Sequence, residues 1–155
     1  MTVELGNTGI RIHQSRIRLK YNWWLGNVGT KFYQELRDRS KILGIKCVEC
    51  QHVYVPPKEN CPKCFRRMEK WEELGATGTL KNFTVVHYSV PLIQPQKPPF
   101  GLGIIQLDGA DSGFIHFLGE MAPKNIKVGM RVEAVFREKR EGNLLDIKYF
   151  RPAQI

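Results

Sequence analysis

Four cysteines are the residues of this 155-residue sequence whose type and spacing most clearly permit chemistry. They form two C-x2-C pairs separated by ten residues, and they are Cys47, Cys50, Cys61 and Cys64. Zinc prefers four soft ligands in a tetrahedron, and two tight turns that each carry a pair of thiolates supply such a set. The intervening residues have room for one short strand over residues 53–55 and a return loop at Pro56 and Pro57. The spacing therefore predicts a zinc ribbon.

Two other uses of these cysteines stay open on the spacing alone. Two disulfides would need an oxidising compartment, but residues 1–6 lack the basic start and apolar stretch of a secretory signal. Iron is a second metal that accepts the same four thiolates. With either metal, sulfur fills every coordination position and none is left for a substrate. We therefore expect a structural site and no reactive thiol.

The remaining sequence contains no recognisable catalytic constellation. It has no G-x-S-x-G motif and no P-loop, and Gly101-Leu102-Gly103 lacks the third glycine of a dinucleotide-binding loop. The four histidines are expected to be structural or surface residues. The isolated chain is therefore not expected to be an enzyme by itself.

Composition and charge narrow the class of protein further. Hydrophobic residues make up 42% and charged residues 25% of the chain, which excludes long intrinsic disorder. No apolar run approaches the roughly 20 residues of a membrane-spanning helix, so a cytoplasmic location is expected. The net charge of +9 lies mainly in residues 1–46, where nine Lys/Arg face three Asp/Glu. Such a balance favours an anionic partner without choosing among nucleic acid, a phosphorylated cofactor and an acidic protein.

The elements that would position the cysteines are helices before them and strands after them. Residues 13–25 place Ile17, Tyr21 and Trp24 on one face of a helix. Thr30 is a candidate N-cap for a second helix over residues 31–39. Beyond Gly75, strands are expected over residues 80–90, 101–107, 113–118, 131–137 and 144–150, with a proline-rich loop over residues 91–99.

Five strands with a break after the third suit a small Greek-key barrel of the OB type. We therefore predict a mainly β fold with N-terminal helices, in which a zinc ribbon precedes a five-stranded OB-fold barrel. The predicted segments are residues 1–44 for the helices, residues 45–74 for the ribbon and residues 75–155 for the barrel.

Longer runs of residues resemble the DUF35 family, whose members pair a rubredoxin-like zinc ribbon with an OB fold. The runs are FYQELRDRSKILGIKC, CVECQHVYVPPKENCPKC, WEELGATGTLKNFTVVHY and GLGIIQLD, within a match over residues 30–152. The resemblance implies that the four cysteines bind zinc. It also implies an accessory role in acyl-CoA chemistry, in complexes with thiolase-superfamily enzymes such as a thiolase, HMG-CoA synthase or a related acyltransferase.

On this resemblance, the chain is expected to be a non-catalytic subunit of a hetero-oligomer that helps enclose coenzyme A (CoA) intermediates. Lys97 would meet a CoA phosphate at a channel mouth that Phe100 lines. The expected anchors of the partner interface are Trp23, Trp24, Phe32 and Tyr33, since aromatic side chains are typical interface hot spots. The alternative is that these four rings pack internally.

A single-stranded nucleic-acid binder is the competing function. A basic chain with an OB barrel and a zinc ribbon is typical of that class. However, residues 75–155 carry only ten Lys/Arg against seven Asp/Glu, and the charges near Arg131 and Glu133 alternate in sign. A single-strand groove needs basic residues and exposed aromatic rings together, so the charge pattern favours the accessory subunit.

Overall fold

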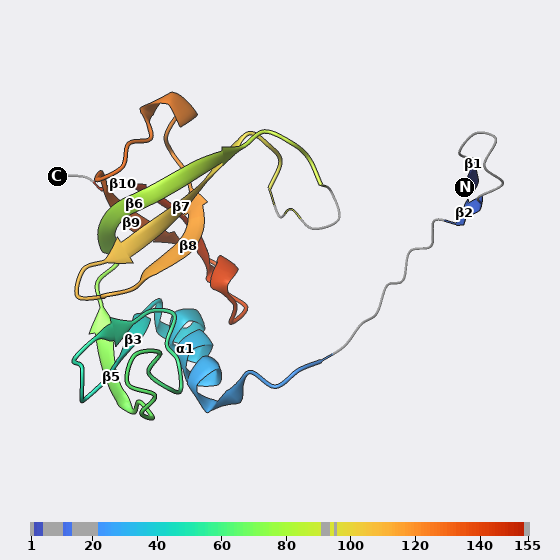
Figure 1. Ribbon diagram of the computed structural model, residues 1–155. Coiled ribbons are helices and arrows are strands. Elements are labelled where there is room, and N and C mark those ends of the chain that lie inside the picture. Colours follow the sequence, from blue (N-terminus) through green and yellow to red (C-terminus); the bar gives the residue numbers. More distant parts are fainter. Residues whose placement is uncertain (1, 5–10, 14–21, 91–93, 95, 154–155) are drawn as a thin grey trace.

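The computed structural model describes residues 2–4, 11–13, 22–90, 94 and 96–153 of the chain (Figure 1). Before the barrel, the elements are β1 (Thr2–Glu4), β2 (Arg11–His13), α1 (Gly26–Arg39), β3 (Ile42–Lys46), β4 (Val53–Tyr54) and β5 (Lys70–Leu74). The barrel is formed by β6 (Thr77–Val86), β7 (Phe100–Leu107), β8 (Gly113–Leu118), β9 (Arg131–Phe136) and β10 (Ile147–Pro152), with short 3-10 turns at Pro123–Asn125 and Leu144–Asp146. None of the described helices is long and apolar enough to cross a membrane.

The helix α1 confirms the helix expected over residues 31–39 but begins earlier, at Gly26. Thr30 is therefore inside the helix and does not cap it. Gly29 inside the helix costs about 1 kcal/mol relative to alanine, which burial of Phe32 and Leu36 in the core outweighs. The helix predicted over residues 13–25 falls mostly on residues 14–21, which lie outside the described residues. Of its described part, residues 22–25 are not helical.

The ribbon is a three-stranded antiparallel sheet in the order β4-β3-β5. Ile45 in the central strand pairs with Tyr54 on one side and Trp71 on the other. The strand predicted between the two cysteine pairs is thus present as β4. Because β3 ends at Lys46, Cys47 directly follows the central strand of the sheet.

The barrel is closed, with the strand order β10-β8-β7-β6-β9. Neighbouring pairs are antiparallel except β8 and β10, which meet in parallel at Phe150 and Leu118. The predicted five-stranded OB barrel is therefore confirmed. The expected start of the last strand at Leu144 is wrong, because Leu144–Asp146 form a 3-10 turn. A register shift between Ile147 and Tyr149 then lets both Ile147 and Phe150 face the core.

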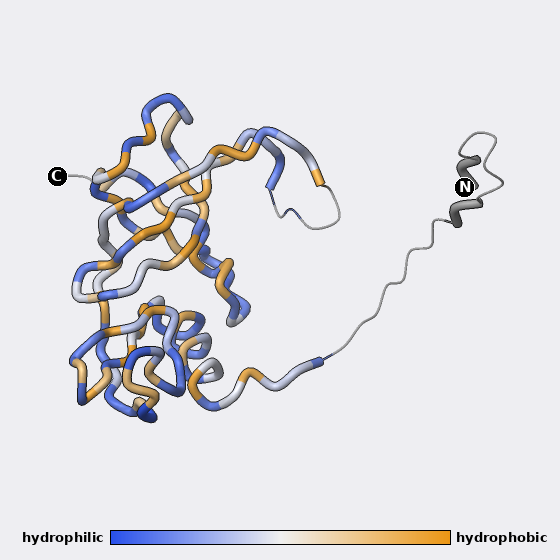
Figure 2. Tube along the Cα trace, in the orientation of Figure 1, coloured by the Kyte–Doolittle hydropathy of each residue, from blue (hydrophilic) through white to orange (hydrophobic). Residues whose placement is uncertain are grey.

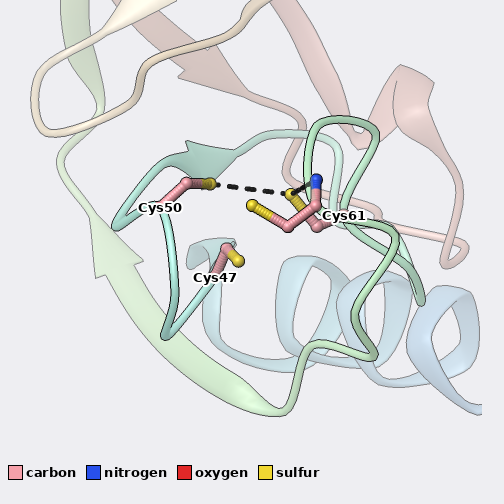
Figure 3. A group of neighbouring side chains, drawn as sticks. Cys47, Cys50 and Cys61 are labelled. Carbon is pink, nitrogen blue, oxygen red and sulfur yellow. Dashed lines mark hydrogen bonds between the residues drawn. The ribbon is translucent and has the colours of Figure 1, made fainter.

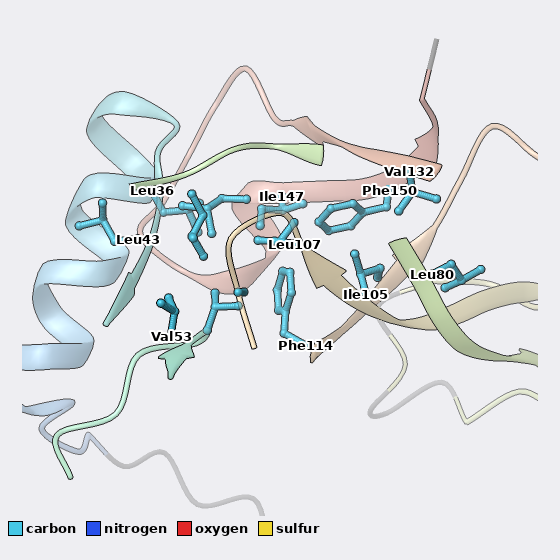
Figure 4. Packing of buried hydrophobic residues seen from close by; sticks show 14 of the residues in the cluster. Leu36, Leu43, Val53, Leu80, Ile105, Leu107, Phe114, Val132, Ile147 and Phe150 are labelled. Carbon is cyan, nitrogen blue, oxygen red and sulfur yellow. The ribbon is translucent and has the colours of Figure 1, made fainter. Parts of the chain in front are cut away.

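One hydrophobic cluster runs from α1 through the ribbon into the barrel (Figure 4). Leu36 comes from the helix, Val53 from the ribbon, and Leu107, Ile147 and Phe150 from the barrel. Along the barrel strands, hydrophobic and hydrophilic residues alternate in short stretches (Figure 2), as expected for strands with one buried face. The three segments predicted from the sequence thus share a core, although their boundaries stay predictions.

The ribbon is joined to the barrel by the turn between β7 and β8. The Val53 amide donates to the Asp111 carboxylate at 2.8 Å, and the Asp111 amide donates back to the Val53 carbonyl at 2.9 Å. The Ser112 hydroxyl accepts from the Val55 amide at 2.7 Å and donates to the Val55 carbonyl at 3.0 Å. These bonds satisfy the backbone groups along one edge of β4, which a short strand would otherwise leave open. The metal-binding turns are therefore held in place by the barrel.

The carboxylate of Asp146 organises the loop between β9 and β10. It is 1% exposed and accepts from the backbone amides of Glu141 (2.8 Å), Gly142 (2.7 Å) and Asn143 (3.3 Å). The same loop reaches α1 through Arg140, whose Nε donates to the Arg37 carbonyl at 2.6 Å. Asp146 thus fixes the loop internally, and Arg140 attaches it to the helix α1.

Replacing Asp146 by Ala is expected to lower the free energy of unfolding by about 1–3 kcal/mol, since buried amides lose their acceptor. Denaturant unfolding of the zinc-loaded chain measures this change. The matched control is Asp38→Ala, because Asp38 is exposed and, among the described residues, forms its ion pair with its neighbour Arg37. An exposed pair contributes little. Equal losses in the two variants would contradict the role given to Asp146.

His116 is a second buried polar residue of the barrel, at 3% exposure. The Phe117 amide donates to its Nδ1 at 2.8 Å, so the proton lies on Nε2, which donates to the Leu144 carbonyl at 3.0 Å. Burial lowers the pKa of the imidazole below its ordinary value, although these hydrogen bonds oppose the shift; nearby Arg137 adds to it. The folded protein therefore holds His116 neutral.

Stability is expected to fall as the pH drops below the ordinary histidine pKa of about 6.5, because the unfolded chain then binds a proton that the folded chain excludes. Above that pH the contribution of His116 is fully present. In His116→Gln the pH dependence of the melting temperature between pH 7.5 and 5.5 should become shallower. Parallel curves for the two proteins would show that His116 does not cause the dependence.

Candidate metal centre

The side chains of Cys47, Cys50, Cys61 and Cys64 converge on one point. Figure 3 shows Cys47, Cys50 and Cys61 pointing toward one another. Their sulfur atoms all lie within 4.8 Å of one another, and the Sγ atoms of Cys50 and Cys61 are 3.6 Å apart. Cys47 and Cys61 are buried, while Cys50 and Cys64 are half-buried. Each C-x2-C pair thus contributes one buried and one half-buried cysteine.

Backbone hydrogen bonds close each of the two turns. In the first, the Cys47 amide donates to the His52 carbonyl at 2.9 Å; in the second, the Cys61 amide donates to the Arg66 carbonyl at 2.8 Å. The residue after the second cysteine of each pair has a positive φ, 61° at Gln51 and 57° at Phe65. The two turns therefore have corresponding geometry, although their intervening residues differ.

The sulfur positions fit a four-coordinate metal. With bonds of about 2.3 Å, a tetrahedral zinc–thiolate centre has sulfur–sulfur separations of about 3.8 Å, close to the 3.6 Å seen between Cys50 and Cys61. All four cysteines are free thiols in the structure, so neither of the two disulfides is formed. The donor set is complete with sulfur, and a bound ion would have no position open for a substrate.

The electrostatics of the cluster explain why a cation is needed. Burial alone raises the pKa of the Cys61 thiol, but hydrogen bonds from the Tyr54 hydroxyl (3.5 Å) and the Cys64 amide (3.4 Å) outweigh it and lower that pKa to about 6. The contact with Cys50, followed by burial, raises the pKa of Cys64 to about 12. One thiolate therefore opposes formation of the next, and a divalent cation removes that opposition.

The residues predicted to bind CoA lie in and after the proline-rich loop. Phe100 is buried at the start of β7 and makes an edge-to-face contact with Phe117, with ring centroids 5.6 Å apart. It borders a mainly apolar hollow of about 250 Å³, lined by Val86, Tyr88, Val90, Gln94, Phe100, Leu102 and Phe117. Lys97 is exposed and is not among the described residues that line this hollow. CoA binding at these residues stays a prediction.

The four predicted interface anchors divide into two groups. Trp23 and Trp24 are 67% and 80% exposed, just before α1. Phe32 is fully buried, with its ring edge-to-face against half-buried Tyr33 at 5.2 Å. The role predicted for Phe32 therefore needs correction: its ring packs in the chain's own core, because the face of α1 that carries it covers the ribbon and barrel.

Sequence reasoning missed other exposed apolar side chains. Phe65 on the second cysteine turn is 83% exposed, and Ile115 on β8 is 62% exposed. Their exposure follows from which surfaces the sheet and barrel leave uncovered, so periodicity gave no signal for it. The positive φ of Phe65 likewise depends on the folded turn.

Two parts of the chain match profiles of known domains. Residues 35–69 match the ChsH2 rubredoxin-like zinc ribbon domain, and residues 71–137 match the ChsH2 C-terminal OB-fold domain. The fold and the cysteine cluster thus define a zinc ribbon joined to an OB-fold barrel.

Relatives and solved structures agree with this class. The chain is 33% identical over 113 residues to a DUF35 domain-containing scaffold protein of Methanocaldococcus jannaschii, covering 70% of this chain and 77% of the relative. A protein of the same description from Methanothermobacter thermautotrophicus is 28% identical over 111 residues, covering 70% and 81%. The chain belongs to the DUF35 family, as its resemblance suggested.

Two solved structures share the fold. The Ltp2-ChsH2(DUF35) aldolase superposes with a TM-score of 0.59 at 22% identity, covering 79% of this chain and 93% of that chain. A DUF35 protein of unknown function from Sulfolobus solfataricus superposes with a TM-score of 0.57 at 23% identity, covering 71% and 78%. These matches support the arrangement of ribbon and barrel described above.

Replacing Cys61 by Ser is expected to abolish stoichiometric zinc binding and to lower the melting temperature by about 10 °C or more, because loss of one ligand opens the tetrahedron. Elemental analysis and thermal unfolding measure the two effects. His52→Gln is the control: His52 lies beside the site, with its Nδ1 2.9 Å from the Cys50 carbonyl oxygen, but outside the cluster of four sulfurs. Full zinc content and unchanged melting in Cys61→Ser would exclude a structural site.

Proposed function

We propose that this chain is a non-catalytic, zinc-containing subunit that docks on a thiolase-superfamily enzyme and supports its acyl-CoA chemistry. The observation that carries the proposal is the convergence of all four cysteines into one sulfur-saturated site. Carbon–carbon chemistry of the thiolase type needs a nucleophilic thiolate with a nearby base. Since this chain has no further cysteine, the partner must supply the nucleophile.

The names of related proteins support dependence on a partner. The archaeal relatives are described as scaffold proteins, and the Ltp2-ChsH2(DUF35) structure is that of an aldolase. A thiolase-superfamily partner is the family expectation extended to this chain. Zinc would be held by the four cysteines and would stabilise the ribbon, with no part in the reaction itself.

Two surfaces would serve this function. Trp23 and Trp24 would contact the partner, because large exposed aromatic rings just before α1 are costly to leave in water. The apolar hollow bordered by Phe100 suits the pantetheine arm of CoA, and Lys97 would meet a phosphate group beyond it. Both assignments belong to the proposal.

The competing nucleic-acid function is disfavoured by the outer face of the barrel. OB folds bind oligonucleotides on the second and third strands of the barrel, which are β7 and β8 here. That face has a hollow of about 300 Å³ bordered by Leu102, Ile104 and Ile115, and no lysine or arginine is among its described lining residues. Single-strand binding combines aromatic stacking with a basic groove, so this surface suits an apolar contact better.

Co-purification with the tagged chain from its native cell is expected to recover a thiolase-superfamily enzyme in stoichiometric amount. Acyl-CoA turnover by that enzyme should fall when the chain is removed and return when the zinc-loaded chain is added back. Mass spectrometry and a turnover assay measure the two outcomes.

The Cys61→Ser chain is the control for this experiment and should not restore turnover. In Trp24→Ala, recovery of the enzyme should fall while the melting temperature stays unchanged, because that ring is exposed. Full activity of the enzyme without the chain would contradict the proposed function. Salt-resistant binding of a single-stranded oligonucleotide near physiological ionic strength would instead favour the competing function.

A further inference from the structure

Phe65 combines two features that are each unfavourable for a folded chain in isolation. Its side chain is 83% exposed, and it belongs to neither of the two hydrophobic clusters formed by the described residues. Its backbone has φ 57°, in the left-handed region that favours glycine. A glycine would form the same turn without exposing a ring to water, so the folding of the ribbon does not account for phenylalanine here.

Gln51, the corresponding residue of the first turn, has a side chain with a local structural role. Gln51 also has a positive φ, of 61°, but its side-chain Nε2 donates to the Val48 carbonyl at 2.5 Å and closes the turn. At Phe65 only the backbone takes part, through its amide donating to the Cys61 carbonyl at 2.9 Å. The two turns therefore differ: the side chain of Gln51 closes its turn, whereas the side chain of Phe65 is exposed to solvent.

The two cysteine turns also carry a second exposed apolar side chain and an ion pair. Val48 on the first turn is 65% exposed. Between the two turns, Arg66 Nε and a carboxylate oxygen of Glu49 form an ion pair at 3.2 Å. This ion pair joins the two cysteine turns, and we call the four residues Val48, Glu49, Phe65 and Arg66 on these turns the knuckle surface.

We propose that Phe65 is an anchor that inserts into an apolar socket on a protein partner, with Val48 beside it on the knuckle surface. The proposal rests on the proposed function only in requiring a protein partner; it does not depend on the partner's reaction. Side chains held in a costly conformation at a surface are typical of sites where function requires them. Aromatic rings that fill a pocket at an interface contribute most of the binding energy there.

The charge of the ribbon indicates that the partner which Phe65 contacts is a protein and not a membrane or a nucleic acid. Residues 47–74 contain five Lys/Arg and five Asp/Glu, so the segment has no net charge. Anionic membranes and nucleic acids attract surfaces with an excess of Lys/Arg. Beside Phe65, Arg66 pairs with Glu49, and Arg67 pairs with Glu59 and Glu69. Exposed Lys63 adds a single positive charge, which is a small excess for either ligand. A neutral surface with a protruding ring instead matches an uncharged socket in a folded protein.

The test compares four full-length, zinc-loaded chains: wild type, Phe65→Gly, Phe65→Asn and the control Ser40→Gly. Ser40 ends α1 with φ 55°, so its change to glycine relieves the same kind of backbone strain at a distant position in the sequence. Asn tolerates the left-handed conformation but is polar. Each chain is tagged and recovered from the native cell, and the protein that co-purifies with the wild type is then titrated against each chain.

Both Phe65 variants are expected to keep full zinc and a melting temperature no lower than the wild type, yet to bind the partner about tenfold more weakly or worse. Ser40→Gly should bind as the wild type does. Unchanged affinity in Phe65→Gly, or a fall in its melting temperature, would overturn the proposal. So would the absence of any stoichiometric protein partner.

Three further outcomes separate this proposal from its alternatives. A partner outside the thiolase superfamily that Phe65→Gly no longer binds would support the anchor while contradicting the proposed function. A thiolase-superfamily partner that Phe65→Gly still binds would do the reverse. Phe65-dependent binding of phosphatidylserine vesicles or a single-stranded RNA oligonucleotide, or Phe65-dependent self-association in sedimentation, would show that the occupant is not a protein partner.

Discussion

Coordination of one ion by four thiolates is the interaction on which the ribbon depends. The hydrophobic cluster around the site is small, with Ile45 and Met68 as its buried non-cysteine members. So little apolar area cannot by itself hold the two cysteine turns together. A divalent cation cancels the mutual repulsion of the sulfurs and links residues far apart in the sequence. The hydrogen bonds of Asp111 to Val53 and of Ser112 to Val55 then connect the ordered ribbon to the barrel.

The same coordination limits what the protein does. A metal ion held by all four sulfurs would have no position open for a substrate, which fits a structural site. Under the proposed function, the chain would offer a partner apolar surface at Trp23 and Trp24 before α1 and at Phe65 on the second cysteine turn, all of which are exposed. If Phe65 contacts a partner as proposed, the ion pair between Arg66 and Glu49 would leave apolar contact as the main source of affinity there.

The barrel illustrates that a fold does not by itself specify a ligand. Its topology is that of OB folds that bind nucleic acids, but Ile104 and Ile115 occupy the face where such proteins place basic and stacking residues. The loop between β9 and β10, which often contacts ligands in OB folds, is instead held against α1 by Asp146 and Arg140. Both differences make these surfaces less suited to a single strand, although Phe83 still contributes an aromatic ring to the hollow.

The sequence by itself determined the four-cysteine site and the succession of strands along the chain. Ligand spacing and alternation of side chains are local properties that the chain carries before it folds. Only the tertiary structure decided that α1 begins at Gly26 and that Leu144 starts a turn, since burial and the hydrogen bonds of Asp146 outweigh local preference there. It also decided that Phe32 is buried while Trp24 and Phe65 are exposed. Exposure depends on which faces of the helix, sheet and barrel cover one another, and neighbouring residues in the sequence do not contain that information.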